Sequence, residues 1–93
     1  MEDFTNYDIA KLLISAHLSA LTSKEIQSLI PSNIDITNRV LVQRTLRHIL
    51  IPQYASNPRY KPYFSTLTRV QVARLLQIPT KELTHDLYIT ITA

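Results

Sequence analysis

Glycine is absent from all 93 residues of the sequence. Phosphate-binding glycine loops and the dinucleotide-binding fingerprint need backbone without a Cβ atom, so both kinds of nucleotide site are excluded. The turns must use proline, asparagine, serine and aspartate instead, as in the stretches PSNID and SNPRYKP.

Cysteine is also absent, which excludes a disulfide framework and a thiolate metal site. The first stretch, MEDFTNYDIAKLLISAHL, begins with acidic residues, whereas a signal peptide begins with basic ones. No apolar run approaches the roughly 20 residues that span a bilayer. We therefore expect a single small domain over residues 1–93, in the cytoplasm with the nucleoid or in the nucleus, and no membrane association.

Catalytic constellations are missing as well. His17, His48 and His85 are far apart and lack metal-ligand spacing, and no serine or threonine has a credible base with an orienting carboxylate. The acidic residues form no paired constellation for acid–base work. We expect no enzyme activity, no cofactor, no metal and no small-molecule substrate.

Acidic residues are missing from the centre of the chain. None occurs from Ile36 to Lys81, a block that holds eight of the ten basic residues and every arginine. Charge segregation of this kind creates a positive potential and favours a polyanionic partner over a merely solvated basic surface.

Hydrophobic periodicity and capping signals predict four helices. Thr22 stands three residues before Glu25, and Thr68 stands three residues before Gln71, so each threonine can form a capping box at a helix start. Apolar residues recur at helical spacing after each start. The expected helices cover residues of about 7–20, 22–30, 36–50 and 68–78.

Two segments break the helical period. The stretch IPQYASNPRYKPYFSTL is rich in proline and tyrosine, and it predicts an irregular β-hairpin over about 53–67 with a basic tip at Arg59 and Lys61. The stretch LYITIT alternates apolar and polar residues, which predicts a strand over about 87–92 that pairs within the chain or with a second copy. The expected fold class is mainly α with a small β-hairpin (α+β).

The order of these elements resembles a winged helix-turn-helix DNA-binding domain. LTSKEIQSLI is similar to its second helix, ITNRVLVQRTLRHIL to its third, and NPRYKPYFSTLT to the wing and its return strand. Within the third helix, VQRTLRHIL is similar to the recognition helix of DeoR-type and related bacterial or phage regulators. The resemblance covers residues from about 9 to 78, although the usual glycines of the turn and wing are missing.

The resemblance implies a third helix in the major groove and a wing on the backbone or minor groove. We expect sequence-specific binding of double-stranded DNA by a small transcriptional regulator that forms a homodimer. Gln43, Arg44 and Arg47 are the candidates for base contacts, because glutamine pairs with adenine and arginine with guanine through two hydrogen bonds each. The candidates for phosphate or minor-groove contacts are Asn38, Arg39, Arg59 and Lys61.

Because the opposite face of this helix is apolar, replacing Arg44 or Arg47 with alanine is expected to leave the melting temperature nearly unchanged. Other interpretations stay open. Arg39 can form a surface ion pair with Asp35, and His48 can support the helix end. The aromatic residues of the expected hairpin, Tyr54, Tyr60, Tyr63 and Phe64, can pack or can stack on bases. The alternative function is a protein–protein adaptor or inhibitor that uses a winged-helix fold without nucleic acid.

Overall fold

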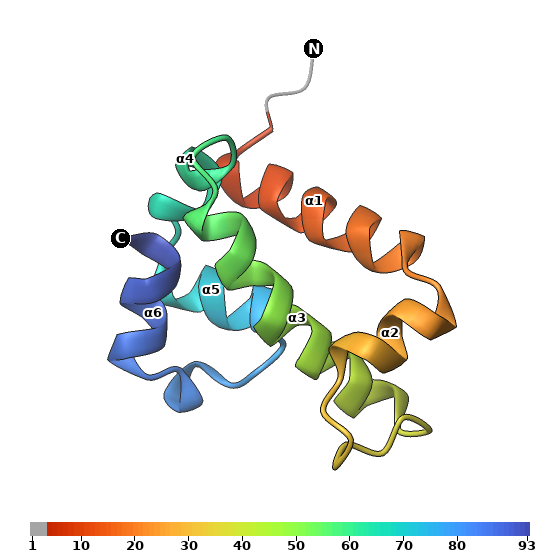
Figure 1. Ribbon diagram of the computed structural model, residues 1–93. Coiled ribbons are helices and arrows are strands. Elements are labelled where there is room, and N and C mark those ends of the chain that lie inside the picture. Colours follow the sequence, from red (N-terminus) through yellow and green to blue (C-terminus); the bar gives the residue numbers. More distant parts are fainter. Residues whose placement is uncertain (1–3) are drawn as a thin grey trace.

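The computed structural model describes residues 4–93, and every regular element in this range is helical (Figure 1). The elements in chain order are α1 (Asn6–Ala20), α2 (Ser23–Leu29), α3 (Arg39–Ser56), α4 (Lys61–Ser65), α5 (Arg69–Leu76), the 3₁₀ turn η1 (Thr80–Glu82) and α6 (His85–Thr92). None of these helices is long and apolar enough to cross a membrane.

The expected α+β winged fold is therefore wrong, because no strand or sheet occurs within residues 4–93. The expected hairpin at 53–67 is instead the end of α3, a tight turn and the short helix α4. The expected strand at 87–92 lies within α6. The third helix also runs longer than expected, from Arg39 to Ser56 instead of about 36–50.

The hairpin prediction was wrong because Pro52 and Pro62 both lie in helices. Pro52 lies inside α3 and removes one backbone donor, but the buried side chains of Ile51 and Ala55 hold the helix against the core on both sides of it. Pro62 lies in the first turn of α4, where the missing N–H would have had no helical partner. Between the two helices, the carbonyl of Asn57 accepts hydrogen bonds from the backbone N–H groups of Tyr60 and Lys61. Prolines that would confine a strand to a sheet edge are thus accommodated by helices.

α6 is a helix because burial overrides its alternating sequence. Its start is capped by Thr84, whose hydroxyl accepts a hydrogen bond from the Leu87 N–H at 3.2 Å. Ile91 is fully buried and Leu87, four residues earlier, is half-buried, whereas Ile89 is 42% exposed. The hydroxyl of Thr90 donates to the carbonyl four residues before it, at 2.8 Å. Leu87 and Ile91 therefore form the buried face of the helix, whereas Ile89 and Thr90 lie on its exposed side.

The two predicted capping boxes are present. The hydroxyls of Thr22 and Thr68 each accept a hydrogen bond from the backbone three residues on, and the side chain at that position returns one to the threonine N–H. Helices accordingly begin at Ser23 and Arg69, as the sequence predicts. A third capping box, between Thr5 and Asp8, starts α1 and was not predicted.

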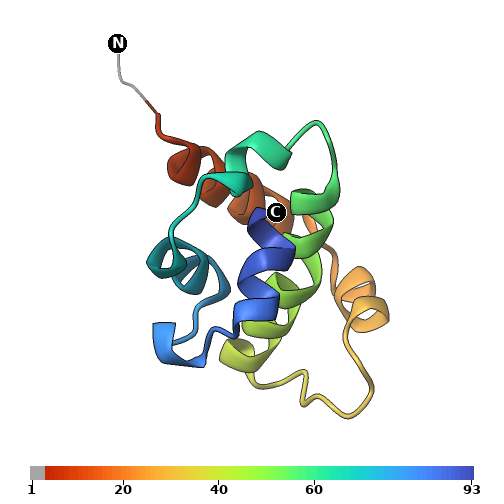
Figure 2. The ribbon, with the colours of Figure 1, turned by 90° about the vertical axis from the view of Figure 1, so that its left-hand side faces the viewer.

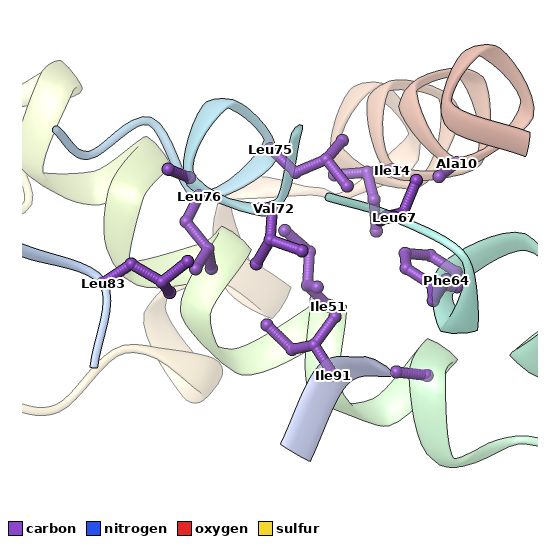
Figure 3. Packing of buried hydrophobic residues seen from close by; sticks show 12 residues of the cluster. Ala10, Ile14, Ile51, Phe64, Leu67, Val72, Leu75, Leu76, Leu83 and Ile91 are labelled. Carbon is purple, nitrogen blue, oxygen red and sulfur yellow. The ribbon is translucent and has the colours of Figure 1, made fainter. Parts of the chain in front are cut away.

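The main core lies where α3 packs against α1, α4, α5 and α6 (Figure 2). Phe64 of α4, Ile51 of α3 and Val72 of α5 are fully buried in it, and Figure 3 shows them converging with residues of α1 and α6. A smaller cluster of Ile30, Val42 and Leu46 lies under α2. We call α2, the loop at 30–38 and the first half of α3 the α2–α3 corner; it projects from the main body in Figure 1.

Candidate nucleic-acid interface

The start of α3 is built by Asn38 and Asp35. The side-chain oxygen of Asn38 accepts a hydrogen bond from the Leu41 N–H at 3.2 Å and so caps the helix. The carboxylate of Asp35 accepts bonds from the hydroxyl and the N–H of Thr37, at 2.6 and 2.9 Å, and these bonds lower its pKa. The carboxylate of Asp35 is therefore bonded within the turn that precedes α3, and no ion pair joins it to Arg39 in the described part of the chain. Arg39, the first residue of α3, is exposed.

The exposed face of the first half of α3 is cationic and contains no carboxylate. Val40, Arg44 and His48 follow one another at four-residue spacing and are all exposed, so they lie on one side of the helix. Gln43 is exposed beside them. The Nδ1 atom of His48 donates to the Arg44 carbonyl at 2.8 Å, which ties the histidine to its own helix. Gln43 and Arg44 are thus the two candidates for base contacts that face solvent.

Arg47 has a different environment from Arg44. Its side chain is half-buried, and its Nη1 atom donates to the Leu75 carbonyl at 3.1 Å, at the end of α5. That carbonyl lies in the last turn of α5, where helical partners are lacking and a cation is favoured. The Nε atom of Arg47 is buried without a partner among residues 4–93, and burial lowers the pKa of the guanidinium. Arg47 therefore joins α3 to α5, and the expectation that it is dispensable for packing is corrected.

Arg59 and Lys61 lie at the other end of α3. The 18 residues of this helix make it roughly 27 Å long at about 1.5 Å per residue. Arg59 belongs to the turn after α3, and its guanidinium lies 5.6 Å from the centre of the Tyr60 ring. Lys61 is the first residue of α4 and is exposed. Because no wing exists, these two cations do not join Asn38 and Arg39 in one cluster.

Arg69 is a second arginine with an internal contact that sequence reasoning missed. Its Nη2 atom donates to the Leu83 carbonyl at 2.8 Å, and its guanidinium lies 5.1 Å from the centre of the Tyr88 ring. The hydroxyl of Tyr88 in turn donates to the Leu67 carbonyl at 3.3 Å. Nothing in the sequence shows that α6 returns over the start of α5, so these contacts of Arg69 could not be predicted. The remaining basic residues of the acid-free block are exposed: Arg39, Arg44, Arg59, Lys61, Arg74 and Lys81.

Few carboxylates are available to neutralise these cations. All ten basic residues but only five of the seven acidic ones lie within residues 4–93. Asp8 and Glu25 each accept hydrogen bonds from a backbone N–H in a capping box, which lowers their pKa values. The only ion pair in this range is between Lys11 and Asp8, at 3.5 Å, so no arginine there is paired with a carboxylate. The surface consequently carries a net positive potential.

Two shallow depressions border α3. The first has a volume of about 230 Å³ and is lined by His17, Gln53, Tyr54, Asn57 and Tyr60. The second has a volume of about 280 Å³, lies between α1 and α3, and contains Arg47 with Gln43 and two serines of α1. Neither holds three potential metal ligands, and no such group of histidine, aspartate and glutamate occurs within residues 4–93.

The aromatic residues of the expected wing pack into the fold. Phe64 is fully buried, and Tyr54 stacks on it with ring centres 6.4 Å apart. Tyr60 meets Tyr54 edge to face at 5.0 Å. The Nδ1 atom of His17 lies 2.7 Å from the Tyr54 hydroxyl, and burial, with a smaller effect of Tyr60, raises the pKa of Tyr54. Tyr54 and Tyr60 also line the first depression, whereas Phe64, another of the four aromatic residues considered for packing or stacking, only packs.

Comparison of the chain with protein-family models, with curated proteins and with solved structures found no match in any of the three.

Proposed function

We propose that the protein binds double-stranded DNA through the α2–α3 corner, with the exposed face of the first half of α3 in the major groove. The observation that carries this proposal is that Gln43 and Arg44 are both exposed on the same half of α3 as Arg39, and that this half contains no carboxylate. A major groove admits one α-helix, and these two side-chain types read adenine and guanine respectively. The proposal needs no wing, so it is independent of the corrected fold class.

Phosphate contacts are available at the start of the same helix. The backbone N–H groups of Arg39 and Val40 lie in the first turn of α3, and among residues 4–93 they have no hydrogen-bond partner. Helix N-termini attract phosphate through such N–H groups and the helix dipole. Arg39 adds a full positive charge at this position, so the corner offers base contacts and a phosphate contact within two helical turns.

The test is binding of labelled duplex DNA, first as a random pool from which the preferred sequence is selected, and then at several salt concentrations. The logarithm of the association constant should fall linearly with the logarithm of the salt concentration, by about 0.9 for each phosphate neutralised. Arg44→Ala should weaken binding to the selected sequence by about 1–3 kcal/mol without changing the melting temperature.

Arg74→Ala is the matched control, because it removes the same charge from an exposed position on α5. It should change affinity much less than Arg44→Ala does. Absence of salt-dependent duplex affinity at low ionic strength contradicts the proposal. Equal losses for the two variants contradict the assigned face, because net charge alone would then explain binding.

A second function is favoured by two exposed apolar side chains of the same corner. Ile36 is 51% exposed and Val40 is 65% exposed, and both lie within three residues of Arg39 in the chain. Apolar side chains next to arginine are common in protein–protein interfaces. A protein adaptor that captures an acidic, partly apolar surface is therefore the alternative. Binding of an acidic amphipathic peptide that is lost in Val40→Ser, with no duplex affinity in the parent, would establish it.

A further inference from the structure

The depression at the far end of α3 is a small pocket built by three segments. His17 comes from α1, Gln53 and Tyr54 come from the last turns of α3, and Asn57 and Tyr60 come from the turn that follows. Its volume of about 230 Å³ is below the range of roughly 300–1,000 Å³ that holds drug-sized ligands. The pocket therefore suits one small group that enters from an open side.

Two tyrosine rings form fixed aromatic walls. Tyr54 is held by Phe64 on one side and by the 2.7 Å contact between its hydroxyl and Nδ1 of His17 on the other. Tyr60 meets Tyr54 at an interplanar angle of 61°, so the two rings form a corner rather than a closed stack. Walls of this kind favour a flat aromatic group over an aliphatic one, because such a group can stack against either ring.

The rim of the pocket carries amide groups with free hydrogen-bonding capacity. Gln53 is exposed, and its side chain has no hydrogen-bond partner in the described part of the chain. The Oδ1 atom of Asn57 accepts a bond from the Arg59 N–H at 3.0 Å, which leaves the side-chain NH₂ group available. A side-chain amide matches the donor and acceptor pair on the N6/N7 edge of adenine. The pocket thus combines stacking surfaces with the hydrogen-bonding groups that an adenine base needs.

Two cations flank the pocket residue Tyr60 in the sequence, and none of the residues that line the pocket is acidic. Arg59 lies over the Tyr60 ring, and Lys61 follows at the start of α4. They are the two basic residues that the length of α3 separates from the α2–α3 corner. Positive charge beside a stacking platform is the arrangement by which proteins hold single-stranded nucleic acid.

We propose that the pocket lined by Gln53, Tyr54 and Tyr60 binds one unpaired purine base, adenine in preference, of a single nucleic-acid strand. Arg59 and Lys61 hold the phosphates of the same strand. This site is separate from the duplex-binding face of α3 and does not depend on it. Because the pocket holds a single base, affinity comes from stacking and charge, and preference comes from the amides of Gln53 and Asn57.

The experiment measures fluorescence anisotropy of labelled single-stranded oligo(dA) and oligo(dT) with the whole chain at low salt. Oligo(dA) should bind more tightly. Tyr60→Ala should weaken this binding by about 5- to 150-fold, since it removes a stacking surface, whereas Tyr60→Phe should keep most of it. Gln53→Ala should reduce the preference for oligo(dA) over oligo(dT). The matched control is Gln27→Ala, which removes an exposed amide from α2 and should change nothing.

Gln53 is exposed, so its variant folds even if Tyr60→Ala does not, and the proposal can still be tested. Unchanged oligo(dA) affinity in Tyr60→Ala together with unchanged base preference in Gln53→Ala overturns it. A second measurement compares the binding of adenosine monophosphate with that of ribose 5-phosphate, which lacks the base. Equal affinity for the two also overturns the proposal, because charge alone would then account for the interaction. Arg44→Ala separates the two proposals: it should weaken duplex binding and leave oligo(dA) binding intact, and Tyr60→Ala should do the reverse.

Discussion

Replacing Arg47 with alanine tests whether this arginine is part of the fold or of the surface. The substitution removes the bond from Nη1 to the Leu75 carbonyl and leaves that carbonyl at the end of α5 without a partner. It also removes a half-buried side chain from the junction of α1, α3 and α5, because Arg47 lines the depression between α1 and α3. Both changes should destabilise the protein.

The magnitude follows from three contributions. A hydrogen bond from a charged donor contributes about 1.5–3 kcal/mol. The methylene groups of the side chain add about 0.8 kcal/mol each when fully buried, which half-burial reduces to roughly 1 kcal/mol in all. Against these, the buried Nε atom has no partner, and removing it recovers a desolvation cost of about 1–3 kcal/mol. The net effect of Arg47→Ala should be a loss of about 1–2 kcal/mol.

Thermal denaturation followed by circular dichroism measures this loss. A chain of 93 residues should show a drop in melting temperature of about 5–15 °C, at about 4–8 °C per kcal/mol for a domain of this size. Arg44→Ala, an exposed arginine three residues earlier on the same helix, is the control and should be almost unchanged. Arg47→Met, which keeps an unbranched apolar stem but not the guanidinium, should lose less than Arg47→Ala. Equal melting temperatures for Arg47→Ala, Arg44→Ala and the parent would refute the assignment of Arg47 to the fold.

Two further predictions concern helix ends. Gln77 ends α5 with φ 59° and ψ 42°, in the left-handed region, which glycine adopts more readily than a residue with a Cβ atom. Gln77→Gly should therefore raise the free energy of unfolding, measured by urea denaturation, by about 1 kcal/mol. A decrease would contradict the argument that Gln77 is strained. Glu25 has its pKa lowered below 4.5 by hydrogen bonds from the N–H and then the hydroxyl of Thr22. A lowered folded pKa gives stability that is present above the unfolded value and is lost as pH falls through the folded one. Glu25→Gln should therefore show a smaller loss of stability than the parent below about pH 4.5, and identical curves for the two would count against the capping bonds.

Local signals in the sequence were sufficient where the structure is decided by a few neighbouring residues. A capping box requires only a threonine and a side chain three positions later, so the helix starts after Thr22 and Thr68 could be predicted from four letters each. The segment around Pro52 could not be predicted in this way. Its helix persists because Ile51 and Ala55 are buried by other helices, and that burial is a tertiary effect with no local signal.

The candidate interface was predictable only in part for the same reason. A helical wheel shows that Gln43, Arg44 and Arg47 lie on neighbouring faces of α3, and the structure agrees for Gln43 and Arg44, which are exposed. The wheel does not show that the end of α5 comes close enough to accept a hydrogen bond from Arg47. Likewise, an acid-free stretch of sequence does not show that α3 separates Arg39 from Arg59 by its whole length.

The way in which α2 packs has a consequence for the order in which the native state opens. α2 contains no buried residue, and its seven residues are well below the roughly 12–15 needed for a marginally stable helix in isolation. It is held by the small cluster of Ile30, Val42 and Leu46, apart from the main core. The amide hydrogens of α2 should therefore exchange with solvent through a partial unfolding that leaves α5 and α6 protected. The first turns of α3 lose their cover in that same opening, so the segment that carries Arg44 should open together with α2.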